Sequence, residues 1–108
     1  MKKKFPPAKI VAIPVDPKDF FKYPDAFDSQ GWTVLSARFP NARLVDLKGN
    51  PKFTNDVATV VFELDKESIR QPKDYADFNE ILVGTFKADV MEFAYSDSHV
   101  YVMLWWFW

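Results

Sequence analysis

The C-terminal segment from Phe86 to Trp108 constrains the fold of this chain most. Two runs of β-branched and aromatic residues flank a short polar break at residues 96–98, which is the pattern of a β-hairpin. A half-buried strand alternates apolar with polar residues, whereas the second run places apolar side chains on both faces. Both faces of this last strand therefore need to be covered.

The composition indicates one well-packed domain. The chain has 108 residues, 18% of them aromatic and only three of them glycine, which argues against disorder. We expect a flexible basic arm at residues 1–7 and a single α+β domain at residues 8–108. The chain contains no cysteine, which excludes disulfides, a thiolate zinc site and a cysteine nucleophile.

The N-terminus, MKKKFPP, is basic but lacks the apolar run of a signal peptide. The longest apolar run, Val100 to Trp108, is far shorter than the roughly 20 residues of a membrane-spanning helix. We therefore expect a cytoplasmic protein without a membrane span.

The order of elements predicts an antiparallel sheet of about five strands. Strands are expected at residues 8–15, 43–47, 57–64 and in the C-terminal hairpin. A short helix is expected after Asp16, a longer one from Ser29 to just before Pro40, and a third from Pro72 to a stop at Gly84. The third helix is expected to carry Tyr75, Phe78, Ile81 and Leu82 on one apolar stripe.

This order fits a two-layer α+β fold with two main helices on one sheet face. It is the ferredoxin-like, split β-α-β order with a C-terminal strand added. Another two-layer α+β fold is the alternative.

If helices cover one sheet face, the other face of the last strand exposes a row of large apolar side chains. Aromatic residues and methionine are enriched at the centres of protein interfaces. We expect this row to bind a partner protein or a second copy of the chain. The alternative is that the early helix, with Phe20, Phe21 and Phe27, folds across the row. The expected partner-binding residues are Tyr101, Met103, Trp105, Phe107 and Trp108.

Nucleic-acid binding is the second hypothesis. Residues 1–54 hold ten Lys and Arg against five Asp, whereas residues 55–108 hold four against ten acids. Lys9, Lys48 and Lys52 are the candidate phosphate contacts. Residues 49–68 resemble part of the RNA recognition motif, whose third strand stacks bases on aromatic rings. The alternate positions 57, 59, 61 and 63 carry no ring here and include an acid, Glu63, which repels phosphate.

The remaining candidate chemistry is sparse. His99 follows Asp97 and Ser98, but adjacent residues point in different directions and seldom form a catalytic relay. Asp74, Asp77 and Glu80 have helical spacing and offer oxygen atoms to a hard cation, yet they also fit the solvated face of a helix. We expect no cofactor and no metal, and an enzyme with dispersed catalytic residues stays the third hypothesis.

The sequence thus favours a small non-enzymatic module that binds a protein partner of unknown identity and acts by occlusion. Compact inhibitors, such as immunity proteins or phage-encoded antagonists of bacterial systems, share this size and this lack of catalytic motifs. A homodimer is compatible with every hypothesis.

Overall fold

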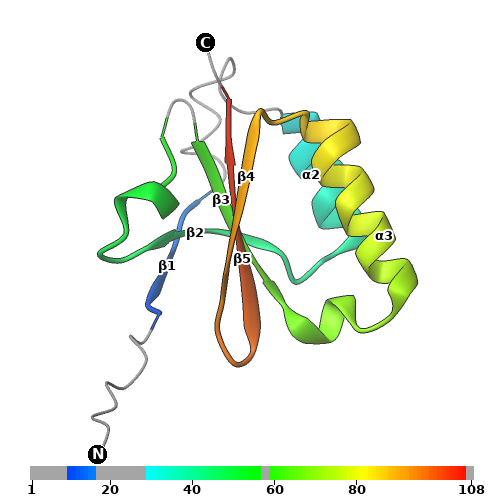
Figure 1. Ribbon diagram of the computed structural model, residues 1–108, viewed down its shortest axis with the longest axis horizontal. Coiled ribbons are helices and arrows are strands. Elements are labelled where there is room, and N and C mark those ends of the chain that lie inside the picture. Colours follow the sequence, from blue (N-terminus) through cyan, green and yellow to red (C-terminus); the bar gives the residue numbers. More distant parts are fainter. Residues whose placement is uncertain (1–9, 17–28, 57–58, 107–108) are drawn as a thin grey trace, which may run out of the picture.

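The computed structural model describes residues 10–16, 29–56 and 59–106, which form an α+β fold (Figure 1). Five antiparallel strands make one sheet, and the helices α2 and α3 lie on the same side of it. The strands are β1 (Ala12–Pro14), β2 (Arg43–Leu47), β3 (Thr59–Asp65), β4 (Val90–Tyr95) and β5 (His99–Trp105). The helices are α2 (Ser29–Arg38), α3 (Pro72–Glu80), its π-helical continuation η3 (Ile81–Phe86) and the 3-10 turns η1 (Pro51–Phe53) and η2 (Lys66–Ile69).

The strand order is β1-β2-β3-β5-β4, and every neighbouring pair is antiparallel. The ferredoxin-like order is therefore not confirmed. A split β-α-β unit runs the two strands joined by a helix in parallel with a third strand between them. Here β1 and β2, which precede and follow α2, are direct antiparallel neighbours. The connection that contains α2 returns the chain to the same edge of the sheet instead of crossing over.

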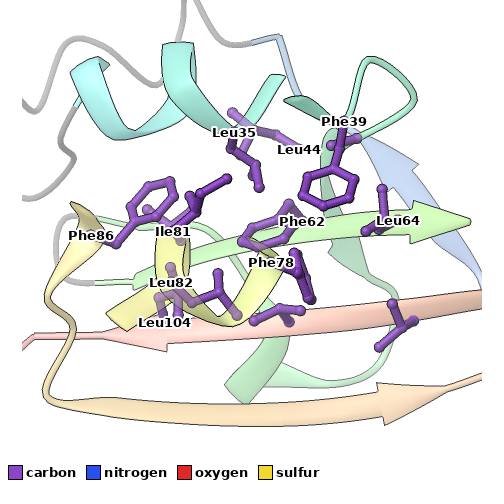
Figure 2. Close-up of a cluster of buried hydrophobic side chains, with 14 of the residues drawn as sticks. Leu35, Phe39, Leu44, Phe62, Leu64, Phe78, Ile81, Leu82, Phe86 and Leu104 are labelled. Atoms are coloured by element: carbon purple, nitrogen blue, oxygen red, sulfur yellow. The ribbon is translucent and has the colours of Figure 1, made fainter. Parts of the chain in front are cut away.

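The main core lies between the helices and one face of the sheet (Figure 2). Phe62, in the middle of β3, lies at its centre. Its ring packs edge-on against Phe78 of α3 at 6.0 Å and stacks with Phe86 of η3 at 6.3 Å. Phe39, which follows α2, packs edge-on against Phe78 at 5.5 Å. Aromatic pairs at these separations add about 0.5–1.5 kcal/mol each to the stabilisation from burial.

The third helix continues past Gly84, so the expected stop at this residue is wrong. The helix widens into η3 and ends at Lys87, whose φ of 54° is left-handed. The extension buries the ring of Phe86, and the indole N–H of Trp106 donates to the Phe86 carbonyl at 3.1 Å. Burial of a phenylalanine contributes about 1.5–3 kcal/mol, which outweighs the roughly 1 kcal/mol that a helical glycine costs.

The second face of the sheet carries a smaller apolar cluster. Its buried members are Val45, Leu47, Phe53, Val61, Tyr101 and Met103. Phe53 belongs to η1, which lies on the side of the sheet away from the helices in Figure 1. Residues 17–28, which include the expected early helix and its phenylalanines, lie outside the described residues. Among the described elements, η1 supplies cover for this face.

Asn55 joins β2 to β3 where these strands separate. Only the first two residues of β2 pair with β3, and the rest of the strand pairs with β1. The Asn55 amide donates to the Val45 carbonyl at 2.8 Å and the Val61 carbonyl at 3.3 Å, and its oxygen accepts from the Val61 N–H at 2.8 Å. The Asn55 backbone N–H donates to the Asp46 carboxylate at 2.8 Å. One side chain thereby satisfies backbone groups that a continuous ladder would have paired.

Replacing Asn55 tests this junction. Asn55→Ala should lower the free energy of unfolding by about 2–4 kcal/mol, because buried backbone groups of Val45 and Val61 lose their partners at about 1–3 kcal/mol each. Asn55→Asp should not restore stability, since a carboxylate cannot donate to a carbonyl. Urea unfolding followed by tryptophan fluorescence measures the change, with the exposed Lys48→Ala as control. An Asn55→Ala midpoint equal to that of the control would contradict this role.

Two helical glycines form a matched pair. A Cβ on Gly84 meets no atom within 4 Å, so Gly84→Ala should raise the free energy of unfolding by about 0.5–1 kcal/mol through helix propensity. A Cβ on Gly31 would lie 3.1 Å from the Phe86 ring. Gly31→Ala should therefore lose this gain to crowding. Thermal unfolding of both variants measures the difference, and equal stabilisation would show that α2 and η3 pack less closely than described.

Candidate functional site

The expected partner-binding row is buried for much of its length. Tyr101 is 4% exposed and Met103 is 3% exposed, and both belong to the apolar cluster under η1. Trp105, the next residue on the same face, is 40% exposed. Phe107 and Trp108 lie outside the described residues. Of the expected contacts that the structure describes, only Trp105 presents a large apolar surface to solvent.

A hollow of about 420 Å³ lies beside Trp105 on the sheet face away from the helices. Met103 and Val90 contribute apolar lining, and Thr59 contributes a hydroxyl group. At the rim, the Lys52 ammonium lies 3.2 Å from the Glu92 carboxylate, which ties the η1 turn to β4. The hollow therefore combines an apolar floor with a charged rim, as binding sites for protein side chains commonly do.

A second recess of about 270 Å³ lies between α3 and β4, on the helix side of the sheet. Tyr75, Phe93 and Tyr95 line it and are 57%, 43% and 64% exposed. The Phe93 and Tyr95 rings stack at 6.4 Å with an interplanar angle of 16°. Tyr75 is thus exposed, unlike the other members of the expected stripe, because the sheet ends at β4 and leaves nothing to cover this side of α3 among the described elements. We refer to Tyr75, Phe93 and Tyr95 as the aromatic edge patch.

The aromatic edge patch was not predicted from the sequence. Met91, Phe93 and Tyr95 alternate with Glu92 and Ala94, so the pattern placed both rings on one face of the strand. It did not indicate that β4 would be an edge strand. That position depends on the long-range pairing of β5 with β3.

A polar cluster occupies the other end of the second face. Glu63 is 4% exposed, and its carboxylate accepts from the Arg43 guanidinium at 2.6 Å and lies 3.8 Å from the His99 ring. Burial raises the pKa of Tyr101, and the neighbouring Glu63 charge raises it further. In the described part of the chain, no buried side-chain nitrogen or oxygen lacks a hydrogen-bond partner. The cluster is thus a satisfied ion pair at the end of the sheet.

His99 does not sit in the geometry of a catalytic relay. One ring nitrogen lies 2.7 Å from the hydroxyl oxygen of its neighbour Ser98. The 3.8 Å between the other ring nitrogen and Glu63 exceeds hydrogen-bonding distance, and Arg43 already holds that carboxylate.

Asp74 and Asp77 of α3 hold this helix against α2. The Arg38 guanidinium lies 2.7 Å from the Asp74 carboxylate and 3.0 Å from that of Asp77. The Arg38 hydrogen bond holds the pKa of Asp74 below its usual value, and the Gln71 backbone N–H adds to this effect. Within the described ranges, no group of three or more His, Asp or Glu side chains is placed to hold a metal ion.

The candidate phosphate contacts do not form one basic surface in the described part of the chain. Lys9 lies outside them. Lys48 is exposed in the turn after β2, and Lys52 is paired with Glu92, whose negative charge would repel a phosphate beside it.

Comparisons with known protein families, with curated proteins and with solved structures found no match. No helix in the described ranges is long and apolar enough to cross a membrane.

The raised pKa of Tyr101 predicts a loss of stability in alkali. In the unfolded chain the Tyr101 phenol ionises near pH 10, whereas in the folded chain the Tyr101 hydroxyl keeps its proton to a higher pH. The folded state then binds more protons, so the free energy of unfolding should fall as the pH rises above about 10. Urea unfolding across this range should show a flatter pH dependence for Tyr101→Phe. An unchanged slope in Tyr101→Phe would contradict the assignment.

Proposed function

We propose that this protein is a small protein-binding module that acts by covering a functional surface of a cytoplasmic partner protein. The observation that carries the proposal is the change in exposure along β5. Tyr101 and Met103 are buried, whereas Trp105 is 40% exposed beside the 420 Å³ hollow. A large aromatic side chain on a rigid strand next to an apolar recess is a typical anchor of a protein interface.

The surroundings of Trp105 support this role. Its strand pairs on both sides, with β3 through Thr59 and with β4 through Val90, so its backbone is held in place before a partner binds. Little conformational entropy is then lost on association, which favours affinity. The hollow offers a partner side chain the apolar surface of Met103.

The Lys52–Glu92 pair adds specificity at the rim. Its ammonium and carboxylate are 3.2 Å apart and remain partly exposed, so the ammonium can donate a further hydrogen bond to a polar partner group and the carboxylate can accept one. Rim charges of this kind affect association rate and partner choice more than affinity. The binding energy is therefore assigned mainly to Trp105.

Affinity capture from the native lysate, with and without nuclease, tests the proposal. The tagged parent chain should retain one stoichiometric protein after nuclease treatment. Trp105→Ala should weaken binding of that protein about 30-fold or more, which corresponds to about 2 kcal/mol. Tyr75→Ala, which removes an exposed ring from the opposite face, is the matched control and should keep full affinity.

Thermal unfolding separates binding from folding. Trp105→Ala should retain a cooperative transition close to that of Tyr75→Ala. A folded Trp105→Ala variant with parental affinity would overturn the proposal, and so would a variant that fails to fold, because Trp105 would then be part of the core. A captured fraction that disappears with nuclease would replace the proposal with nucleic-acid binding.

A further inference from the structure

The two edges of the sheet differ in how well they are protected. β1 has three residues and ends at Pro14, which has no backbone N–H to offer. β4 has six residues, without proline or lysine, and no strand in the described part of the chain pairs with its outer side. Natural proteins usually protect a strand edge of this length with charge, proline or a bulge. The β4 edge instead carries the exposed rings of Phe93 and Tyr95.

The hairpin register determines which backbone groups face outward. Ser96 donates its backbone N–H to the His99 carbonyl at 2.9 Å, so this pair closes the β4–β5 ladder. Hydrogen-bonded and non-hydrogen-bonded pairs alternate in an antiparallel ladder. The backbone groups of Ala94 and Glu92 therefore point to β5, and those of Met91, Phe93 and Tyr95 point away from it. The residues with outward backbone groups also carry the side chains on the helix side of the sheet.

We propose that the β4 edge pairs antiparallel with β4 of a second copy, about a two-fold axis through Phe93, to form a continuous ten-stranded sheet. This register is the one that uses all three outward-facing residues. Met91 then pairs with Tyr95 of the other copy, Phe93 with Phe93, and Tyr95 with Met91. The inference rests on the β4 edge and does not depend on the partner bound at Trp105.

Side chains on the helix side are self-complementary in this register. Phe93 lies opposite Phe93, and Met91 lies opposite Tyr95, so every cross-strand pair on this face is apolar or aromatic. The stacked Phe93 and Tyr95 rings of each copy form one continuous cluster along the axis. The second copy also closes the open side of the recess under Tyr75.

Charges on the other face are also compatible with a second copy. Glu92 is the one ionisable carboxylate within β4, and the register places it opposite Ala94 rather than opposite its own copy. Lys52 of the same chain neutralises it at 3.2 Å. Beyond the strand ends, Asp89 lies opposite Asp97, and both are exposed. Repulsion between these exposed acids is screened by salt, so the pairing should strengthen as ionic strength rises.

The area of the contact indicates a weak dimer. Tyr75, Phe93 and Tyr95 together expose on the order of 300–400 Å² in one copy, taking about 200 Å² for each whole residue. A stable interface buries about 800 Å² on each partner. Main-chain pairing and the outer surface of α3 supply the remainder, so we expect association in the micromolar range or weaker.

Sedimentation of the purified full chain tests the proposal. The parent chain should change from monomer to dimer between about 1 μM and 1 mM, the range expected for a contact of this size. Phe93→Lys should stay monomeric over the same range. Ile13→Lys is the matched control, because Ile13 is 46% exposed on the opposite edge against 43% for Phe93, and it should dimerise like the parent. A monomeric parent chain overturns the proposal and leaves the edge to a strand of a different protein. A dimer that Phe93→Lys does not disrupt also overturns the proposal.

Single cysteines test the register, since the chain contains none of its own. Hydrogen-bonded neighbours in an antiparallel pair have Cα atoms about 5.5 Å apart, within the range that a disulfide spans. Phe93→Cys should therefore cross-link on oxidation at concentrations where the parent is dimeric. Tyr95→Cys should not, because its two copies lie about 13 Å apart along the strands. Cross-linking of both variants, of neither, or of Tyr95→Cys alone contradicts the two-fold axis at Phe93.

Discussion

The need to bury both faces of the central strands β3 and β5 governs the structure. All residues of β3 except Asp65 are buried, as are Val100 to Leu104 of β5. A sheet covered by helices on one face would leave half of these side chains in water. On the face away from the helices these side chains include Val61, Tyr101 and Met103. Each would forfeit about 1.5–3 kcal/mol if exposed, so the loss would be comparable with the typical margin of stability of a small domain, about 5–15 kcal/mol. The chain meets this constraint with a different cover on each face.

The two covers depend on one junction. On the helix side, the rings of Phe39, Phe62, Phe78 and Phe86 join the end of α2 with β3, α3 and η3 in one core (Figure 2). On the other side, β2 leaves β3 and continues beside β1, and the chain then forms η1 next to the second cluster. The separation of β2 from β3 would leave backbone groups unpaired, and the amide of Asn55 pairs with them. The polar side chain of Asn55 thus allows β2 to leave β3, so that η1 can cover the second apolar cluster.

The surfaces that remain exposed follow from where these covers end. The η1 cover leaves Trp105 partly exposed at the end of β5, and the helix cover leaves Phe93 and Tyr95 exposed along β4. The exposed rings of the two surfaces lie on opposite faces of the sheet, so Trp105 and Phe93 can be replaced separately. The proposed partner binding at Trp105 and the proposed pairing of β4 edges therefore use different surfaces of one small domain.

The sequence by itself determined the elements, because hydrophobic periodicity and capping are local. It predicted α2 between Ser29 and Pro40, the five strands and the hairpin around residues 96–98, and it showed that both faces of the last strand need cover. Only the tertiary structure decided the strand order, the continuation of α3 past Gly84, and which of Tyr101, Met103, Trp105 and Tyr95 are exposed. These depend on contacts between residues far apart in the chain, such as Phe86 with Gly31 and Phe39 with Phe78. Their energies arise when the elements meet, so no local pattern contains them.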